Sequence, residues 1–552
     1  MKPLHTVINL FTAAILLLFG SCSVITKEVD LILHNATIYS VDEQWNIYQA
    51  MAIKDGKIVA LGPEREILNQ YTASKIIDCE KKFIYPGFID AHCHFLGYGR
   101  MLHEVDLSDT KSFEEVISRV TEFSKSNKRP WIIGRGWDQN DWAITEFPDR
   151  FLLDSLFPDT PVYLKRIDGH AALANAAALK IADIVDAVEV KGGSIEVRNG
   201  RLTGILIDNA MNLVEQSIPP SSEEDDRQAL LSAQQKCFAA GLTTVDDAGL
   251  LKKDVDLIKQ LHQSGELKMR MYVMLSDDTS NFSHYLKAGI DTTERLTVRA
   301  FKFYADGALG SRGACLTDPY SDLLPQKYNG FLLDSVNHFI TRAIQLKEAG
   351  FQMCTHAIGD SANRVMLNIY GDIIGSEKDH RWRIEHAQVL SQHDISKFGE
   401  YNIIPSIQPT HATSDMPWAY LRLGTNRVKR AYTYRELKEQ LGMCALGTDF
   451  PVEDINPLGT FYSAVVRKNY NGEPAGGFQM ENALSREDAL RGMTIWAAIS
   501  NFEENHKGSL EEGKYADFVI LDQDLLKCME DAILKTKVRS TWINGEKVYP
   551  LQ

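Results

Sequence analysis

Two histidines one residue apart, His92 and His94, stand at the end of an apolar run that begins at Phe88. On a β-strand, side chains two positions apart lie on the same face, so both imidazoles could bind one metal ion while Cys93 points away. A strand that carries two histidines for purely structural reasons is the alternative. Because a metal needs further ligands, the first hypothesis requires that other parts of the chain supply them.

Four later segments also present a residue that can bind or assist a metal. These residues are Lys302, His356, His386 and Asp449. Taken singly, each has an ordinary structural explanation, such as an ion-paired lysine, a buried histidine or a helix cap. Each lies in or directly after a short apolar stretch, and this shared position favours a single site.

The elements that position these residues are predicted to form a (β/α)8 TIM barrel. Between residues 86 and 503, short apolar strands alternate with amphipathic helical stretches, as in parallel βα units. In such a barrel the chemistry lies at the C-terminal ends of the strands, where the candidate ligands fall. The eight strand candidates are 88–91, 242–246, 269–275, 300–304, 352–355, 382–385, 404–408 and 443–446.

Two regions are predicted outside the barrel itself. The interval of about 97–235 is too long for one crossover helix, so we interpret it as an inserted subdomain. Hairpin signals at Asp55-Gly56 and at Asn544-Gly545 occur near the two ends of the chain. Because isolated hairpins are marginal, residues 28–85 and 504–552 are expected to form one small β-sandwich domain. The fold class is therefore α/β.

The first residues resemble an export signal. Lys2 precedes an apolar run over residues 7–19, and two small residues precede Cys22, as in the lipobox of bacterial lipoproteins. Phe19 departs from that pattern, which usually has leucine there. We expect residues 1–21 to be removed and Cys22 to be lipidated, which anchors the protein to a membrane of the bacterial cell envelope. A secreted protein cleaved nearby is the alternative.

Composition excludes some partners. A formal net charge of −15 with no compensating basic cluster argues against nucleic-acid binding. The eight cysteines contain no Cys-x-x-Cys pair and indicate no disulfide framework. A small-molecule substrate is the expected partner, and a homo-oligomer is left open.

Together the motifs resemble the amidohydrolase superfamily of metal-dependent hydrolases, in the N-substituted formamide deformylase-like branch (amidohydrolase family 3). The resemblance covers nearly the whole mature chain and rests on residues 86–94, 168–170, 302–307, 384–386, 447–451 and 508–517. It implies that His92 and His94 bind an inner metal, and that His356 and His386 bind a second one. Lys302 can bridge the two after carboxylation, and Asp449 is the implied proton shuttle.

The implied cofactor is one or two Zn²⁺ per subunit, which imidazole and carboxylate ligands suit. The implied reaction is attack of a metal-activated hydroxide on a non-peptide amide of an N-acyl or N-formyl amine, with Asp449 as base and then acid. Alternatives are a cyclic-amide, dipeptide or ester hydrolase of the same superfamily, or an envelope lipoprotein that binds a ligand without turnover.

Several residues are expected near the pocket. His170, in Asp168-Gly169-His170, is a catalytic candidate that contacts substrate or its developing oxyanion, although it could equally pin a loop. The candidates for substrate binding are Trp137, Asp138, Gln408, His411 and Asp415. For these residues, core packing and loop anchoring are the structural alternatives.

Overall fold

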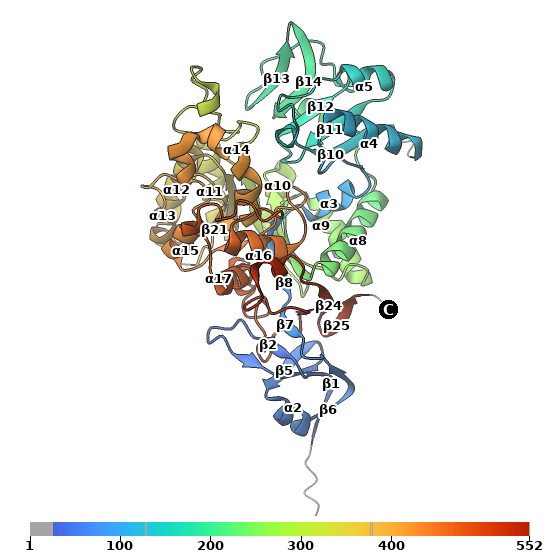
Figure 1. The fold of residues 1–552 in the computed structure, drawn as a ribbon, viewed down its shortest axis with the longest axis vertical. Coiled ribbons are helices and arrows are strands. Elements are labelled where there is room, and N and C mark those ends of the chain that lie inside the picture. The colour runs from blue at the N-terminus through green and yellow to red at the C-terminus, as the bar shows by residue number, and fades with distance from the viewer. Residues whose placement is uncertain (1–25, 127–129, 376, 378, 551–552) are drawn as a thin grey trace, which may run out of the picture.

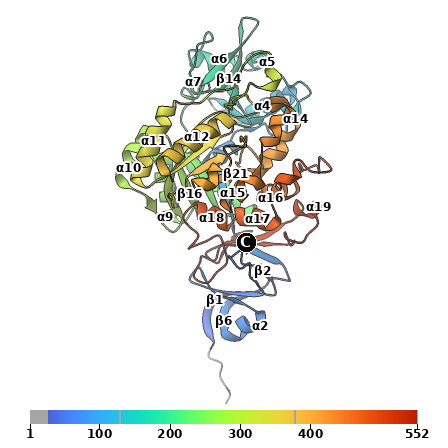
Figure 2. The ribbon, with the colours of Figure 1, turned by 90° about the vertical axis from the view of Figure 1, so that its left-hand side faces the viewer.

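The centre of the molecule is a parallel β-barrel surrounded by helices (Figures 1 and 2). The computed structural model describes residues 26–126, 130–375, 377 and 379–550. Neighbouring strands pair in parallel, as the sequence predicts, in the order β8 (Phe88–Cys93), β15 (Leu242–Leu250), β16 (Arg270–Ser276), β18 (Leu296–Tyr304), β19 (Gln352–Ala357), β20 (Arg383–His386), β21 (Ile404–Ile407) and β22 (Ala445–Leu446).

The segment after β22 leads back to β8 and nearly closes the ring. The backbone N–H of Asp449 donates to the carbonyl of His92, and the N–H of His94 donates to the carbonyl of Phe450, both at 2.8 Å. These two bonds fix the end of the last strand against the end of the first. The predicted (β/α)8 barrel is confirmed, and its closure brings two of the candidate site residues together.

Burial on both faces explains the apolar strands. Every residue of β8, β19 and β20 is buried, as expected for parallel strands covered by helices. Phe282 of α10 packs on Phe301 of β18 with ring centroids 4.4 Å apart. The main outer helices are α8 (Glu223–Ala239), α9 (Lys252–Ser264), α10 (Thr279–Ala288), α11 (Val336–Ala349), α12 (Asp360–Ile374), α14 (Pro409–Arg427), α15 (Tyr434–Leu441), α16 (Pro457–Val466) and α17 (Arg486–Gly492).

The predicted insertion is a separate mixed sheet between β8 and β15, at the top of Figure 1. Two short helices, α5 (Phe151–Leu156) and α6 (Ala176–Ile181), accompany it together with the longer α4 (Phe113–Ser126). The order of its strands is β13 (Gly193–Arg198), β14 (Arg201–Asp208), β12 (Ala171–Ala174), β11 (Val162–Arg166), β10 (Ile132–Trp137) and β9 (Val105–Asp106).

A β-sandwich lies at the opposite end of the molecule (Figure 1). One sheet is N-terminal and the other combines both ends of the chain, as predicted, and Phe518 and Trp542 stack between them at 5.3 Å. The strands of the N-terminal sheet follow the order β5 (Lys57–Gly62), β4 (Ala50–Lys54), β1 (Lys27–His34) and β6 (Tyr71–Asp78). The strands of the shared sheet follow the order β25 (Glu546–Tyr549), β24 (Val538–Ile543), β23 (Phe518–Leu521), β7 (Phe83–Pro86), β2 (Thr37–Tyr39) and β3 (Ile47–Tyr48).

The predicted lipidation site, Cys22, lies outside the described residues and stays a prediction. The seven cysteines within the described ranges are all free thiols, in agreement with the absence of a predicted disulfide framework. Within the same ranges, no helix has the length and apolarity needed to cross a membrane.

A histidine in one of the helices around the barrel makes the free energy of unfolding depend on pH. His262 of α9 donates its Nε2–H to the carbonyl of Met269 at 3.0 Å, and burial lowers the pKa of His262 to about 4. In the unfolded chain His262 has its ordinary pKa of about 6.5, whereas in the folded protein its pKa is about 4. Between these two pH values the unfolded chain binds a proton that the folded protein does not, so the free energy of unfolding decreases as the pH falls through this range. We expect wild type to lose about 1–2 kcal/mol more stability than His262→Gln between about pH 7 and pH 5.

Urea unfolding at the two pH values measures this difference, and substitution of the exposed His393 by Gln is the control. Equal pH slopes for wild type and His262→Gln would contradict the assignment.

Candidate active site

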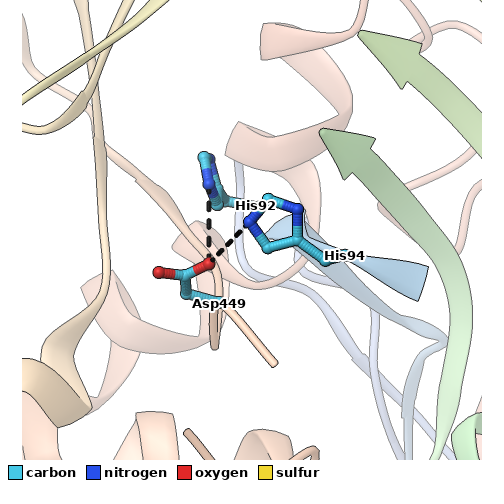
Figure 3. A group of neighbouring side chains, drawn as sticks. All are labelled: His92, His94 and Asp449. Carbon is cyan, nitrogen blue, oxygen red and sulfur yellow. Dashed lines mark ion pairs between the residues drawn. The ribbon is translucent and has the colours of Figure 1, made fainter. Parts of the chain in front are cut away.

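Three predicted residues converge where the first and last barrel strands meet. His92 lies in β8, His94 follows it directly, and Asp449 follows β22. Figure 3 shows the two imidazoles directed at one carboxylate oxygen. Asp449 Oδ1 is 3.3 Å from His94 Nε2 and 3.7 Å from His92 Nε2. The predicted pair of His92 and His94 is therefore joined by a carboxylate from the segment that follows the last barrel strand.

This geometry fits a metal ion. Two donors on one tetrahedral zinc, each about 2.0–2.2 Å from the ion, lie about 3.3–3.6 Å apart. The spacings between Asp449 Oδ1 and the two imidazoles are close to that range. Asp449 Oδ1 is also buried and accepts no hydrogen bond from any described residue, although buried carboxylate oxygens are normally satisfied. The three residues thus have the donor types, the spacing and the unused acceptor that a bound cation requires.

The outer nitrogens of the two histidines are already engaged. His92 donates its Nδ1–H to Glu385 Oε2 at 2.6 Å, and His94 donates its Nδ1–H to the carbonyl of Ala248 at 2.9 Å. These bonds fix the tautomer, so the lone pair of each Nε2 faces Asp449. Glu385 adds a buried negative charge behind His92, which raises the basicity of that imidazole as a ligand.

Two residues of the site have left-handed backbone conformations. His386 has φ 71° and Asp449 has φ 63°, values that non-glycine residues adopt rarely. The turn at His386 breaks the alternation of β20. As a result Glu385 and His386 both face His92, whose ring centroid is 5.1 Å from that of His386.

A second group of potential ligands surrounds the other oxygen of Asp449. His411 Nε2 lies 3.3 Å from Asp449 Oδ2, and its Nδ1 lies 2.8 Å from Glu453 Oε1. His386, His411 and Asp449 form a buried set able to hold an ion. His411, which is predicted to contact substrate, contacts the carboxylate of Asp449, the predicted proton shuttle.

The electrostatics keep Asp449 ionised. Burial alone raises the pKa of a carboxyl group, yet the hydrogen bond from His411 and the close approach of the neighbouring histidines hold the pKa of Asp449 well below its usual range. Burial likewise opposes protonation of His411, but the carboxylates of Asp449 and Glu453 raise its pKa well above the usual value. Without a bound cation, His411 is thus the positive partner of Asp449.

His356 and Lys302 complete the predicted set. The ring of His356 lies 4.5 Å from that of His386, and His356 Nε2 and His386 Nδ1 are buried without a hydrogen bond among the described residues. Burial lowers the pKa of both imidazoles well below the usual value, so both are neutral and can bind a metal. Lys302 donates from Nζ to His92 Nε2 at 3.0 Å, so its ammonium uses the lone pair that a metal needs.

His170 reaches the site from the insertion. Its ring centroid is 5.4 Å from that of His356, and its Nδ1 is 2.6 Å from Asp208 Oδ1. Two glycines leave room for this carboxylate, because a Cβ on Gly313 would lie 2.6 Å from Asp208 Oδ2 and one on Gly307 would lie 2.9 Å from it. Asp208 thereby orients the imidazole, and it was not found from the sequence because it lies in no motif.

Two of the predicted substrate-binding residues have structural roles instead. Trp137 is 1% exposed, packs in the core of the insertion and donates its indole N–H to the carbonyl of Leu164 at 2.9 Å. This corrects the prediction for Trp137, because neither its ring nor its N–H is free for a substrate. Asp138 caps a short 3-10 helix by accepting from the N–H of Asn140 and pairs with the buried Arg166.

The other two predicted residues lie beside the site at the start of α14. Gln408 is buried, and its Oε1 has no hydrogen-bond partner among the described residues. Asp415 accepts from Tyr432 Oη at 2.8 Å, and burial raises the pKa of Asp415 to about 7. Both therefore stay candidates for substrate contact.

Comparisons with known proteins agree with this geometry. A model of the amidohydrolase family matches residues 75–549. Protein LONG AFTER FAR-RED 3 of Arabidopsis thaliana is 33% identical over 94% of this chain and 92% of its own length. N-substituted formamide deformylase of Arthrobacter pascens is 26% identical over 94% of this chain and 98% of its own. An uncharacterized metal-dependent hydrolase from Pyrococcus horikoshii has a TM-score of 0.74 and 27% identity, covering 91% of this chain and 99% of its own. The chain therefore belongs to family 3 of the amidohydrolases, a group of metal-dependent hydrolases.

Proposed function

We propose that this protein hydrolyses a non-peptide C–N bond, that of an N-acyl or N-formyl amine. The observation that carries the proposal is the carboxylate of Asp449, which is held ionised between two groups of metal-binding histidines. The similarity to N-substituted formamide deformylase supports the choice of an amide.

The residues that would hold the metal are His92 and His94 on one side, and His356 and His386 on the other. A bound divalent ion, zinc by preference, would acidify a water molecule and polarise the amide carbonyl. Asp449 accepts the proton of the attacking water. It then gives the proton to the amine nitrogen as the C–N bond breaks.

Three further residues position this chemistry. His411 holds Asp449 Oδ2 and so fixes the direction of the carboxylate. His170, oriented by Asp208, keeps Nε2 available to donate to the carbonyl oxygen as negative charge develops there, a contribution typically worth about 10²–10³-fold in rate. The free amine of Lys302 can add carbon dioxide with loss of one proton, and the resulting carbamate offers anionic oxygens as metal ligands. The carbamate would also no longer donate a hydrogen bond to His92 Nε2, so the lone pair of that nitrogen would be free for the metal.

A screen of N-formyl and N-acyl amines tests the proposal. Purified zinc-loaded protein is incubated with each amide and with the ester of the same acyl group, and the released amine or alcohol is quantified. We expect release of amine that depends on the metal. Release of alcohol alone would indicate an esterase, and binding of the amides without release of amine would indicate a binding protein.

A further inference from the structure

One arginine of the insertion is directed away from the core by a distorted strand. In β10 the pairing with β11 shifts between Arg135 and Trp137, at Gly136. Gly136 has φ 117°, and a Cβ there would lie 2.7 Å from the backbone nitrogen of Ser108, so this position requires glycine. Such bulges redirect side chains next to functional sites. Here Trp137 enters the core of the insertion while Arg135 faces the other way.

The guanidinium of Arg135 has no counter-ion. No carboxylate within the described part of the chain lies within 4.0 Å of it, although its neighbour Arg166 in β11 pairs with both Asp138 and Asp168. Among the described residues, the side chain of Arg135 makes a single hydrogen bond, from Nη2 to the carbonyl of Ile167 at 2.9 Å, and its Nε is buried without a partner. An arginine so poorly satisfied is rare, because partly buried guanidinium groups are normally paired.

Arg135 lies at the rim of the active site. A Cβ built on Gly169 would lie 3.2 Å from Arg135 Nη2, and the next residue, His170, stacks beside His356. Burial lowers the pKa of Arg135, and the negative charges of Asp449, Asp168 and Glu104 oppose that shift. Arginine stays protonated in proteins at neutral pH, so the site presents a positive charge that no described carboxylate pairs with directly.

We propose that Arg135 binds a carboxylate of the substrate, so that the amides hydrolysed here are N-acyl or N-formyl amino acids. A planar guanidinium binds a carboxylate through two parallel hydrogen bonds. One unpaired positive charge balances a monoanion, which fits a carboxylate better than a phosphate dianion. The inference rests on the proposed function for the identity of the bond cleaved, while the recognition of the carboxylate by Arg135 is a separate property.

Matched substrates test the proposal. The N-formyl derivatives of glycine, leucine and phenylalanine are each compared with the same molecule lacking the α-carboxylate. We expect wild type to favour the carboxylate-bearing member of each hydrolysed pair by about 10- to 100-fold in kcat/KM. Arg135→Met should lower kcat/KM for the carboxylate-bearing member of each pair, through KM, far more than for the neutral member, and Arg135→Lys should restore part of the preference. Arg198→Met, at a paired arginine in β13, is the control, and thermal unfolding verifies that each variant is folded.

The outcomes separate the two proposals. Equal preference in wild type, or an unchanged preference in Arg135→Met, overturns the role of Arg135 while leaving amide hydrolysis standing. If no compound is hydrolysed, calorimetric binding of the N-formyl amino acids is compared in wild type and Arg135→Met. Binding that depends on Arg135 then supports carboxylate recognition and rejects the proposed reaction, and absence of binding rejects both.

Discussion

Asp449→Asn is expected to lower kcat/KM for amide hydrolysis by about 10²–10⁴-fold, the usual contribution of general acid–base catalysis. Asparagine has nearly the same shape as aspartate and can still hydrogen-bond to His411. It carries no charge and cannot accept a proton from water. We therefore expect the loss to appear in kcat, with little change in the unfolding temperature of the protein.

Steady-state kinetics together with metal analysis measure this effect. Asp454→Asn, which changes an exposed carboxylate five residues away, is the matched control and should retain full activity. Asp449→Asn that retained its metal and kept kcat within about tenfold of wild type would show that another group moves the proton.

The barrel and the grouping of the candidate ligands at one end of it could be predicted because both depend on local patterns. Each strand is a short apolar run, and a parallel barrel places the ends of all its strands on one face. A histidine at the end of β19 and another at the end of β20 are therefore brought together by topology alone. The order of His92, Lys302, His356 and Asp449 along the chain was enough to place them in one site.

The partners of those ligands could not be predicted, because they depend on side-chain directions that no local pattern encodes. Glu385 precedes His386, and strict strand alternation would point it away from the site. The left-handed backbone at His386 overrides that rule. His411 follows β21, and its position suggested substrate contact, but α14 begins in a direction that carries its imidazole to Asp449.

The insertion was the least predictable part. The sequence predicts a substrate contact at Trp137 and gives no reason to consider Arg135. The bulge at Gly136 reverses the faces that alternation assigns. Whether a glycine in a strand produces a bulge depends on the close approach of Ser108, which is visible only in the folded molecule.

His94→Asn is expected to reduce the affinity for zinc at least 100-fold and to lower kcat/KM by about 10³-fold or more, because loss of an imidazole removes both a ligand and the activation of water. The structure supplies the reason for this large effect, since His94 Nε2 is fixed toward Asp449 by the bond from its Nδ1–H to Ala248. Equilibrium dialysis with metal analysis measures the affinity. His103→Asn, at an exposed histidine, is the control.

The same measurement on Lys302→Ala decides whether the lysine bridges two ions. If a carbamate on Lys302 is a ligand, Lys302→Ala should bind fewer ions per chain than wild type, and added acetate should restore part of the activity by replacing the lost carboxylate. If Lys302 stays an ammonium, its removal frees His92 Nε2 from a competing hydrogen bond, and zinc affinity should rise. The two roles thus predict opposite changes in zinc binding, and a Lys302→Ala variant with full metal content and activity contradicts bridging.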